Sequence, residues 1–232
     1  MDNKLFSRIL VATLIPVSLY MIYIAGSWGL ADIYYRPAKI ELKNWRSGKI
    51  ELADKDWDRL RLNLSKALEL DADNPEIHEM LALAMEGRFL NLASKDAGAQ
   101  SSRQLALEHY RKSVLLRPAW PYAWAGLISV KYRLGQFDED FFEALHNVVK
   151  LGPWEPGLQR LVIEIGLNEW NVFPIEEKKF VLEVVARALE KQPGKILPLI
   201  KEKGFLDLIC FINQGKTNVV EYCEKHKKVK AE

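Results

Sequence analysis

The sequence predicts an all-α protein in which a single N-terminal transmembrane helix is followed by a solenoid of paired helices. Three observations predict this class. Residues 9–31 contain no charged side chain and are long enough to cross a bilayer as a helix. No segment after Asp54 shows the sustained alternation of polar and apolar residues that marks a strand. Two later segments repeat one pattern of helix end and helix start, which indicates stacked helix pairs.

The bulk composition is that of a folded chain that does not bind nucleic acid. Of the 232 residues, 49% are hydrophobic and 28% are charged, which favours a packed core over disorder. The formal net charge is +2, so the chain lacks the strong basic excess of a nucleic-acid-binding protein.

The charge-free segment is predicted to be a retained membrane anchor. Lys4 and Arg8 precede it and Asp32 follows it. The positive-inside rule therefore places residues 1–31 as a cytoplasmic tip and transmembrane helix, and the remaining domain outside the cytoplasm. For the bacterial inner membrane that we expect, that side is the periplasm. A cleaved signal peptide is the alternative, because small residues occur near Ala31. The apolar segment is longer than a signal peptide needs, which favours the anchor.

The rest of the chain divides by pattern. Residues 32–52 are expected to be an irregular linker, and residues 53–151 to form helical repeats. An extended polar turn is expected at residues 91–102. Residues 152–214 are expected to form helix pairs that cap the solenoid, and residues 215–232 a charged tail.

The repeat is clearest at residues 66–75 (KALELDADNP) and 110–121 (YRKSVLLRPAWP). In each segment a small residue, Ala67 or Ser113, lets two helices approach closely. A proline, Pro75 or Pro121, then begins the next helix, where its missing N–H costs nothing. The unit that starts at Pro121 also carries large, core and turn residues at suitable spacing: Trp124, Leu127, Gly135 and Phe137. The pattern resembles the tetratricopeptide repeat over residues 54–151.

A second resemblance is carried by residues 116–124 (LRPAWPYAW), 131–138 (KYRLGQFD) and 151–156 (LGPWEP). These strings are similar to small membrane-anchored bacterial proteins of the VpsP type, which are associated with exopolysaccharide biosynthesis. The resemblance covers most of the chain and implies a non-enzymatic scaffold or assembly role in polysaccharide synthesis or export. An envelope protein-secretion or quality-control adaptor is the alternative function.

Motifs for catalysis, cofactors or metals are incomplete. His78-Glu79 begins like a zinc-protease motif, but Ala82 stands where the second histidine is needed. Gly215-Lys216-Thr217 ends like a phosphate-binding loop, but Cys210 stands where that loop needs glycine. We therefore expect no enzyme activity, no cofactor and no metal. For Cys210 and Cys223 two separate buried thiols are favoured over a disulfide.

A partner-binding groove is predicted on the first helix of each repeat, which lines the concave face in this class of fold. The predicted residues are Glu79, Leu83 and Glu86 in one unit and Tyr122, Ser129, Tyr132 and Arg133 in the next. Tyrosine and arginine beside glutamate suit a peptide of a membrane-complex protein. The seven tryptophans could also stack on sugar rings, although packing between helices is favoured for them.

Overall fold

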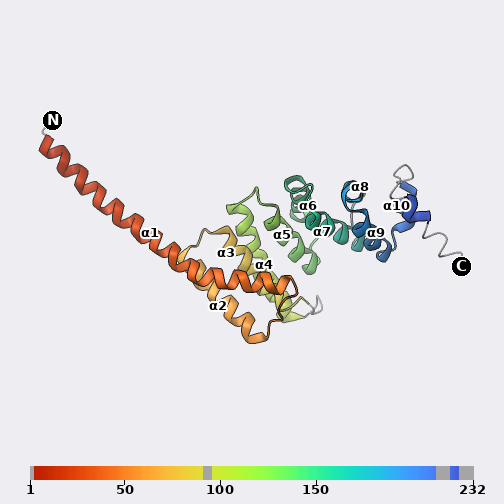
Figure 1. The fold of residues 1–232 in the computed structure, drawn as a ribbon, viewed down its shortest axis with the longest axis horizontal. Helices are drawn as coiled ribbons and strands as arrows, with labels where there is room; N and C mark the ends of the chain where they lie inside the picture. Colours follow the sequence, from red (N-terminus) through yellow and green to blue (C-terminus); the bar gives the residue numbers. More distant parts are fainter. Residues whose placement is uncertain (1–2, 91–95, 213–219, 225–232) are drawn as a thin grey trace. The chain divides into compact units, whose positions relative to one another are not determined.

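The computed structural model describes residues 3–90, 96–212 and 220–224 and is all-helical over these residues (Figure 1). The helices are α1 (Asn3–Arg46), α2 (Asp54–Leu70), α3 (Pro75–Gly87), α4 (Ala97–Leu116), α5 (Pro121–Leu134), α6 (Glu139–Leu151), α7 (Pro156–Asn168), α8 (Ile175–Lys191), α9 (Pro193–Glu202) and α10 (Leu206–Ile212). They belong to two compact units, Met1–Arg117 and Pro118–Glu232. Within each unit, consecutive helices pack as neighbours, which is the arrangement of a helical-repeat domain.

Helix α1 is long and apolar enough to cross a membrane. Its first part lies free of the other helices, and its large apolar side chains are exposed, as at Ile22 and Tyr23 (Figure 1). The helix then continues without a break to Arg46. The linker predicted at residues 32–52 is therefore wrong for residues 32–46, which are helical; residues 47–53, before α2, are non-helical.

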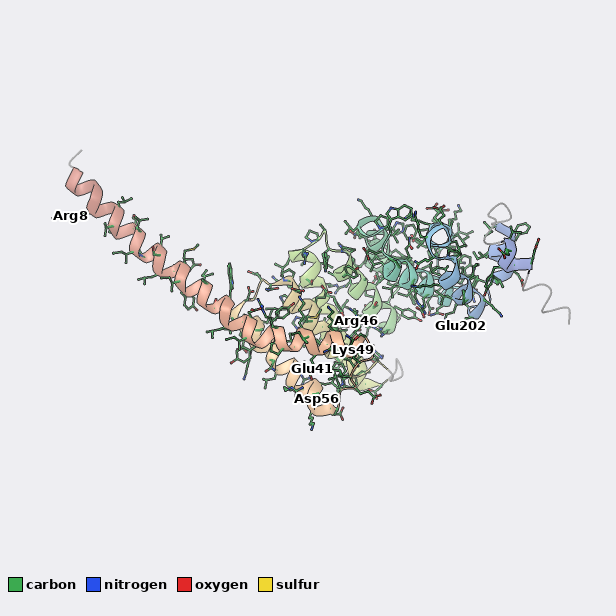
Figure 2. The ribbon with its side chains drawn as sticks, viewed as in Figure 1. Arg8, Glu41, Arg46, Lys49, Asp56 and Glu202 are labelled. Carbon is green, nitrogen blue, oxygen red and sulfur yellow. A yellow bond between two sulfur atoms is a disulfide. The ribbon has the colours of Figure 1, made fainter. Side chains whose placement is uncertain are left out.

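The second part of α1 is helical because it packs in the core of Met1–Arg117. Ala31, Tyr35, Ala38 and Leu42 are buried at helical spacing and face the buried side chains of α2, which are Trp57, Leu60, Leu64 and Ala67. These contacts outweigh the cost of Pro37 inside the helix. The half repeat predicted from Asp54 thus has its missing partner helix in α1, and Glu41 and Arg46 lie on this packed part (Figure 2).

Polar caps set the start of the next pair, α3 and α4. The Asn74 side chain accepts hydrogen bonds from the backbone N–H groups of Glu76 and Ile77, and Pro75 occupies the first turn of α3. The Asp96 side chain accepts from the N–H of Ala99, and α4 begins at Ala97. The extended turn predicted at residues 91–102 is therefore helical from residue 97 on, and residues 91–95 lie outside the described residues.

In Pro118–Glu232 the predicted junctions are confirmed. Helix α5 begins at Pro121 and ends at Gly135, whose φ of 69° is the left-handed conformation that glycine adopts without strain. The Asp138 side chain then caps α6 by accepting from the N–H of Phe141. Helices α7 and α8 form the following pair, and α9 and α10 extend it. Residues 156–212 of the predicted capping segment are therefore largely helical, and residues 213–214 lie outside the described residues.

The prediction of two separate thiols is wrong, because Cys210 on α10 and Cys223 form a disulfide. Residues 220–224 are helical, and Cys223 in this segment is buried. The charged tail predicted at residues 215–232 is described only for these five residues, and the remainder lies outside the described residues.

Candidate functional site

Two of the three groove residues predicted on α3 are buried. Leu83 is 6% exposed and Glu86 is 3% exposed, whereas Glu79 is partly exposed. The hydroxyl of Tyr110 on α4 donates a hydrogen bond of 3.2 Å to the Glu86 carboxylate. Leu83 and Glu86 therefore belong to the interior of Met1–Arg117, and the prediction that they contact a partner is wrong for this structure.

The residues predicted on α5 are partly or fully exposed, and all four lie within Pro118–Glu232. Tyr122 donates a hydrogen bond of 3.0 Å to Glu155, and this carboxylate raises the pKa of Tyr122. Ser129 donates to the carbonyl of Ala125 on its own helix. Tyr132 accepts a hydrogen bond of 3.2 Å from the side-chain amide of Asn168 on α7. Tyr122, Ser129, Tyr132 and Arg133 thus form a polar, aromatic strip that is available at the surface of this unit.

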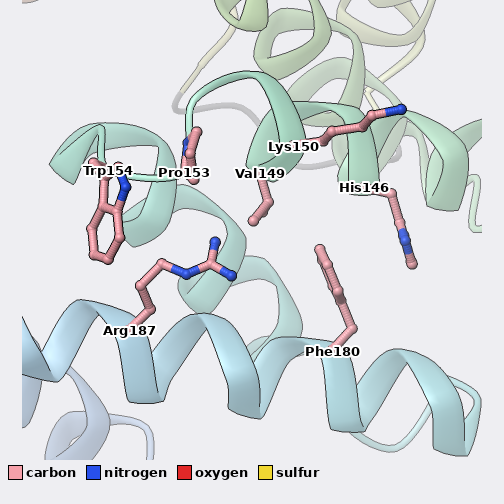
Figure 3. A pocket seen from close by; sticks show the side chains of 7 residues that line it. All are labelled: His146, Val149, Lys150, Pro153, Trp154, Phe180 and Arg187. Atoms are coloured by element: carbon pink, nitrogen blue, oxygen red, sulfur yellow. The ribbon is translucent and has the colours of Figure 1, made fainter.

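A cleft lies elsewhere in the same unit, between α6, the turn that follows it, and α8 (Figure 3). It is a hollow of about 460 Å³. The residues that line it are His146, Val149, Lys150, Pro153, Trp154, Phe180 and Arg187. Both helices are the second members of their pairs, whereas the binding residues predicted from the sequence lie on first members.

Aromatic rings form the two sides of the cleft. His146 stacks on Phe180 with ring centroids 4.1 Å apart and planes within 7° of parallel. Nε2 of His146 lies 2.8 Å from the Glu177 carboxylate, which fixes the orientation of the imidazole. On the other side, Trp154 is 57% exposed although it is large and apolar. An exposed indole beside a hollow is a typical feature of a contact surface.

Three cationic side chains lie at the cleft or beside it. The Arg187 guanidinium and the Lys191 ammonium lie 5.8 and 5.7 Å from the centroid of the Trp154 ring, within the range of a cation–π contact. Lys150 lines the opposite side (Figure 3). Within the part of the chain that the structure describes, none of the three pairs with a carboxylate. The cleft is therefore suited to an anionic group that carries an apolar ring or chain, since guanidinium binds carboxylates and phosphates strongly.

The cleft was not predicted because its residues come from three places in the chain. Trp154 was the one residue whose position in the sequence pointed to this cleft. It lies in a turn between two prolines, where it is not needed for packing inside a helix pair. The positions of Lys150 and Arg187 follow from the packing of α6, α7 and α8, which helical periodicity alone does not define.

A histidine pair connects α3 and α4 in the other unit. Nδ1 of His78 lies 2.9 Å from Nδ1 of His109, and Nε2 of His78 lies 3.0 Å from the carbonyl oxygen of Ala72. A carbonyl only accepts, so Nε2 of His78 carries a proton and its Nδ1 accepts from Nδ1–H of His109. Burial lowers the pKa of both imidazoles, and the nearby His78 lowers that of His109 further.

The two histidines form a hydrogen bond between α3 and α4, and no third side chain among the described residues joins them to make a metal site. Across residues 3–90, 96–212 and 220–224, no group of three or more histidine, cysteine, aspartate or glutamate side chains is arranged to hold a metal ion.

Comparison with known proteins finds no family model that matches the chain and no curated protein that matches it.

Proposed function

We propose that this protein is a membrane-anchored, non-enzymatic scaffold whose tetratricopeptide-like domain assembles partners of an exopolysaccharide synthesis or export system. The observation that carries the proposal is the continuity of α1, which runs from an exposed apolar segment into the core of the first helix pair. A helix built in this way fixes a binding domain to a membrane without a flexible linker. The polysaccharide system is inferred from the resemblance to VpsP-type proteins.

Two features support an inner-membrane location with the domain in the periplasm. Arg8 precedes the apolar segment and Asp32 follows it, as the positive-inside rule requires for this orientation. The Cys210–Cys223 disulfide suits an oxidising compartment such as the periplasm. Reporter fusions at the C-terminus check the orientation: a periplasmic reporter should be active and a cytoplasmic reporter inactive.

Two surfaces of Pro118–Glu232 are suited to a partner. Lys150 and Arg187 line the cleft, and Arg187 and Lys191 lie over its exposed indole, which favours an acidic group. The strip on α5 presents Tyr132 and Arg133, which favours a peptide. An envelope protein-secretion or quality-control adaptor would use the same surfaces, so the identity of the partners decides between these two functions.

Crosslinking in membranes, followed by affinity purification and mass spectrometry, tests the proposal. Recovery of polysaccharide synthases or exporters supports the scaffold, and recovery of secretion factors or folding factors supports the adaptor. Lys150→Gln with Arg187→Gln and Lys191→Gln should reduce recovery if the cleft is used. Tyr132→Ala with Arg133→Ala should do so if the strip is used.

A matched control is a triple glutamine variant at Arg160, Lys195 and Lys201. These cations are exposed in the same unit, do not line the cleft, and give the same change in net charge. This control should retain the recovery of the unsubstituted chain. Recovery that is unaffected by the cleft and strip variants would reject both surfaces.

A further inference from the structure

Helices α1 and α2 run antiparallel. Three contacts along their length show which residues of the two helices lie side by side. Trp45 packs on Trp57 with ring centroids 4.9 Å apart, and Arg59 pairs with Glu41. Nearer the start of α1, the Lys66 ammonium lies 5.5 Å from the centroid of the Tyr34 ring. In each pair the residue number rises on α2 as it falls on α1. Extending this register by one turn places the end of α2, at Leu70, beside Leu30 and Ala31.

Helix α3 begins and α4 ends at this same end of the unit. In the first turn of α3, Glu76 accepts a hydrogen bond of 2.5 Å from Lys39 on α1. Asp73, in the turn after α2, lies 3.6 Å from the ammonium of Lys112 on α4. The last turn of α4, which contains Leu115, therefore extends beyond Lys112 in the direction of the apolar segment of α1.

The position of this end relative to a bilayer follows from the length of the apolar segment. A hydrocarbon core of about 30 Å takes about 20 residues of helix, which are residues 9–28, and the headgroup layer takes roughly four or five more. Trp28, 58% exposed, then lies at the interface, where indole rings are favoured. Ala31 lies within the headgroup layer, and it is 2% exposed because the domain covers it. The domain must therefore enter that layer.

The side chains at this end are suited to that environment. Leu115 is 78% exposed and Ile33 is 65% exposed, although both are large and apolar. Charges of both signs surround them: Arg36 pairs with Asp32, and Lys112 pairs with Asp73. Lipid headgroups also carry both signs, and long cationic side chains extend toward phosphate while their stems remain in apolar surroundings.

We propose that this end of Met1–Arg117 is a lipid-binding surface, defined by Ile33, the turn from Leu70 to Asn74, and the last turn of α4, with Leu115 inserted among the headgroups. The bilayer then holds the domain at two places, through α1 and through this surface. The proposal rests on the membrane anchoring stated above, but it concerns a different contact, between lipid and the folded domain.

Photocrosslinking of the full chain in nanodiscs of phosphatidylethanolamine and phosphatidylglycerol tests it. A photoreactive phenylalanine analogue is placed at Leu115, at Leu105 on the same helix, or at Tyr20 within the apolar segment. All three positions are exposed, so folding should tolerate them. Lipid adducts are measured by intact mass. We expect at least about fivefold more adduct at Leu115 than at Leu105, since ten residues of helix place Leu105 about 15 Å farther from the bilayer.

Each other outcome rejects a stated claim. Adducts at Tyr20 with equal, low yields at Leu115 and Leu105 would leave the anchor in place and overturn the lipid-binding surface. Absence of adducts at Tyr20 would overturn the anchor, and the surface with it. High and equal yields at Leu105 and Leu115 would show that the domain lies on its side along the bilayer, which also overturns the proposed surface.

Discussion

The two units are built from helix pairs of the same kind, but they join their helices differently. In Met1–Arg117, the pair α3 and α4 contains buried polar side chains that face each other across the helices, including His78 and the Glu86–Tyr110 hydrogen bond. In Pro118–Glu232, the pair α5 and α6 encloses clustered rings centred on Phe141, and its buried Lys131 pairs with Asp138 of the turn. Hydrogen bonds between buried polar side chains thus join α3 to α4 in the first unit, whereas a cluster of phenylalanine rings lies at α5 and α6 in the second unit.

Removal of a ring from the phenylalanine cluster should destabilise the second unit strongly. Phe141 is fully buried and contacts Phe137, Phe142 and Phe173 with ring centroids 5.2 to 6.0 Å apart. Phe141→Ala should lower the free energy of unfolding of this unit by roughly 3–5 kcal/mol, because the removed ring leaves a cavity. Chemical denaturation monitored by circular dichroism measures the change. A loss below that of an ordinary surface substitution would mean that the ring cluster does not form.

A matched pair of substitutions tests the polar interior of the first unit. Tyr110→Phe removes the buried hydroxyl that donates to Glu86, and should destabilise Met1–Arg117 by about 1–3 kcal/mol, because the buried carboxyl group loses this donor.

Tyr122→Phe is the control for this prediction. It also removes a tyrosine hydroxyl that donates to a glutamate, but at the surface of the second unit. Water replaces an exposed hydrogen bond, so this variant should change stability by less than about 0.5 kcal/mol. Equal losses in the two variants would contradict the difference between the units.

The smallest expected effect is a pH dependence of the stability of the first unit. The folded-state pKa values of His78 and His109 are lowered from the ordinary value of 6.5, mainly by burial. The unfolded chain then binds more protons than the folded one below that pH, so stability is complete above pH 6.5 and falls as the pH drops toward the lowered values. Lys112, Asp73 and Glu108 are the charged groups that act on the pair.

Thermal unfolding at a series of pH values measures this loss. His109→Gln should weaken the pH dependence below pH 6.5, because it removes one of the two buried imidazoles. An identical pH profile for the unsubstituted chain and His109→Gln would show that the pair does not set the acid sensitivity.

The helix junctions could be read from the sequence because local chemistry defines them. Pro75 and Pro121 each begin a helix, and Gly135 ends one in a left-handed conformation, as predicted. The groove was predicted less well. Repeat position placed Leu83 and Glu86 at the surface, but Leu83 packs in the core with residues of α1 and α2, and Glu86 accepts a hydrogen bond from Tyr110 on α4. The cleft and the histidine pair were missed, because each joins side chains from helices that are distant in sequence.

By itself the sequence determined the all-α class, the apolar segment, and the residues at which the paired helices begin and end. These features depend on periodicity and capping, which involve residues close together in the chain. Only the tertiary structure decided that residues 32–46 continue α1, that Cys210 and Cys223 are joined, and that Lys150, Trp154 and Arg187 share a cleft. In each of these cases the free energy comes from contacts between distant segments, and local propensity does not encode which segments meet.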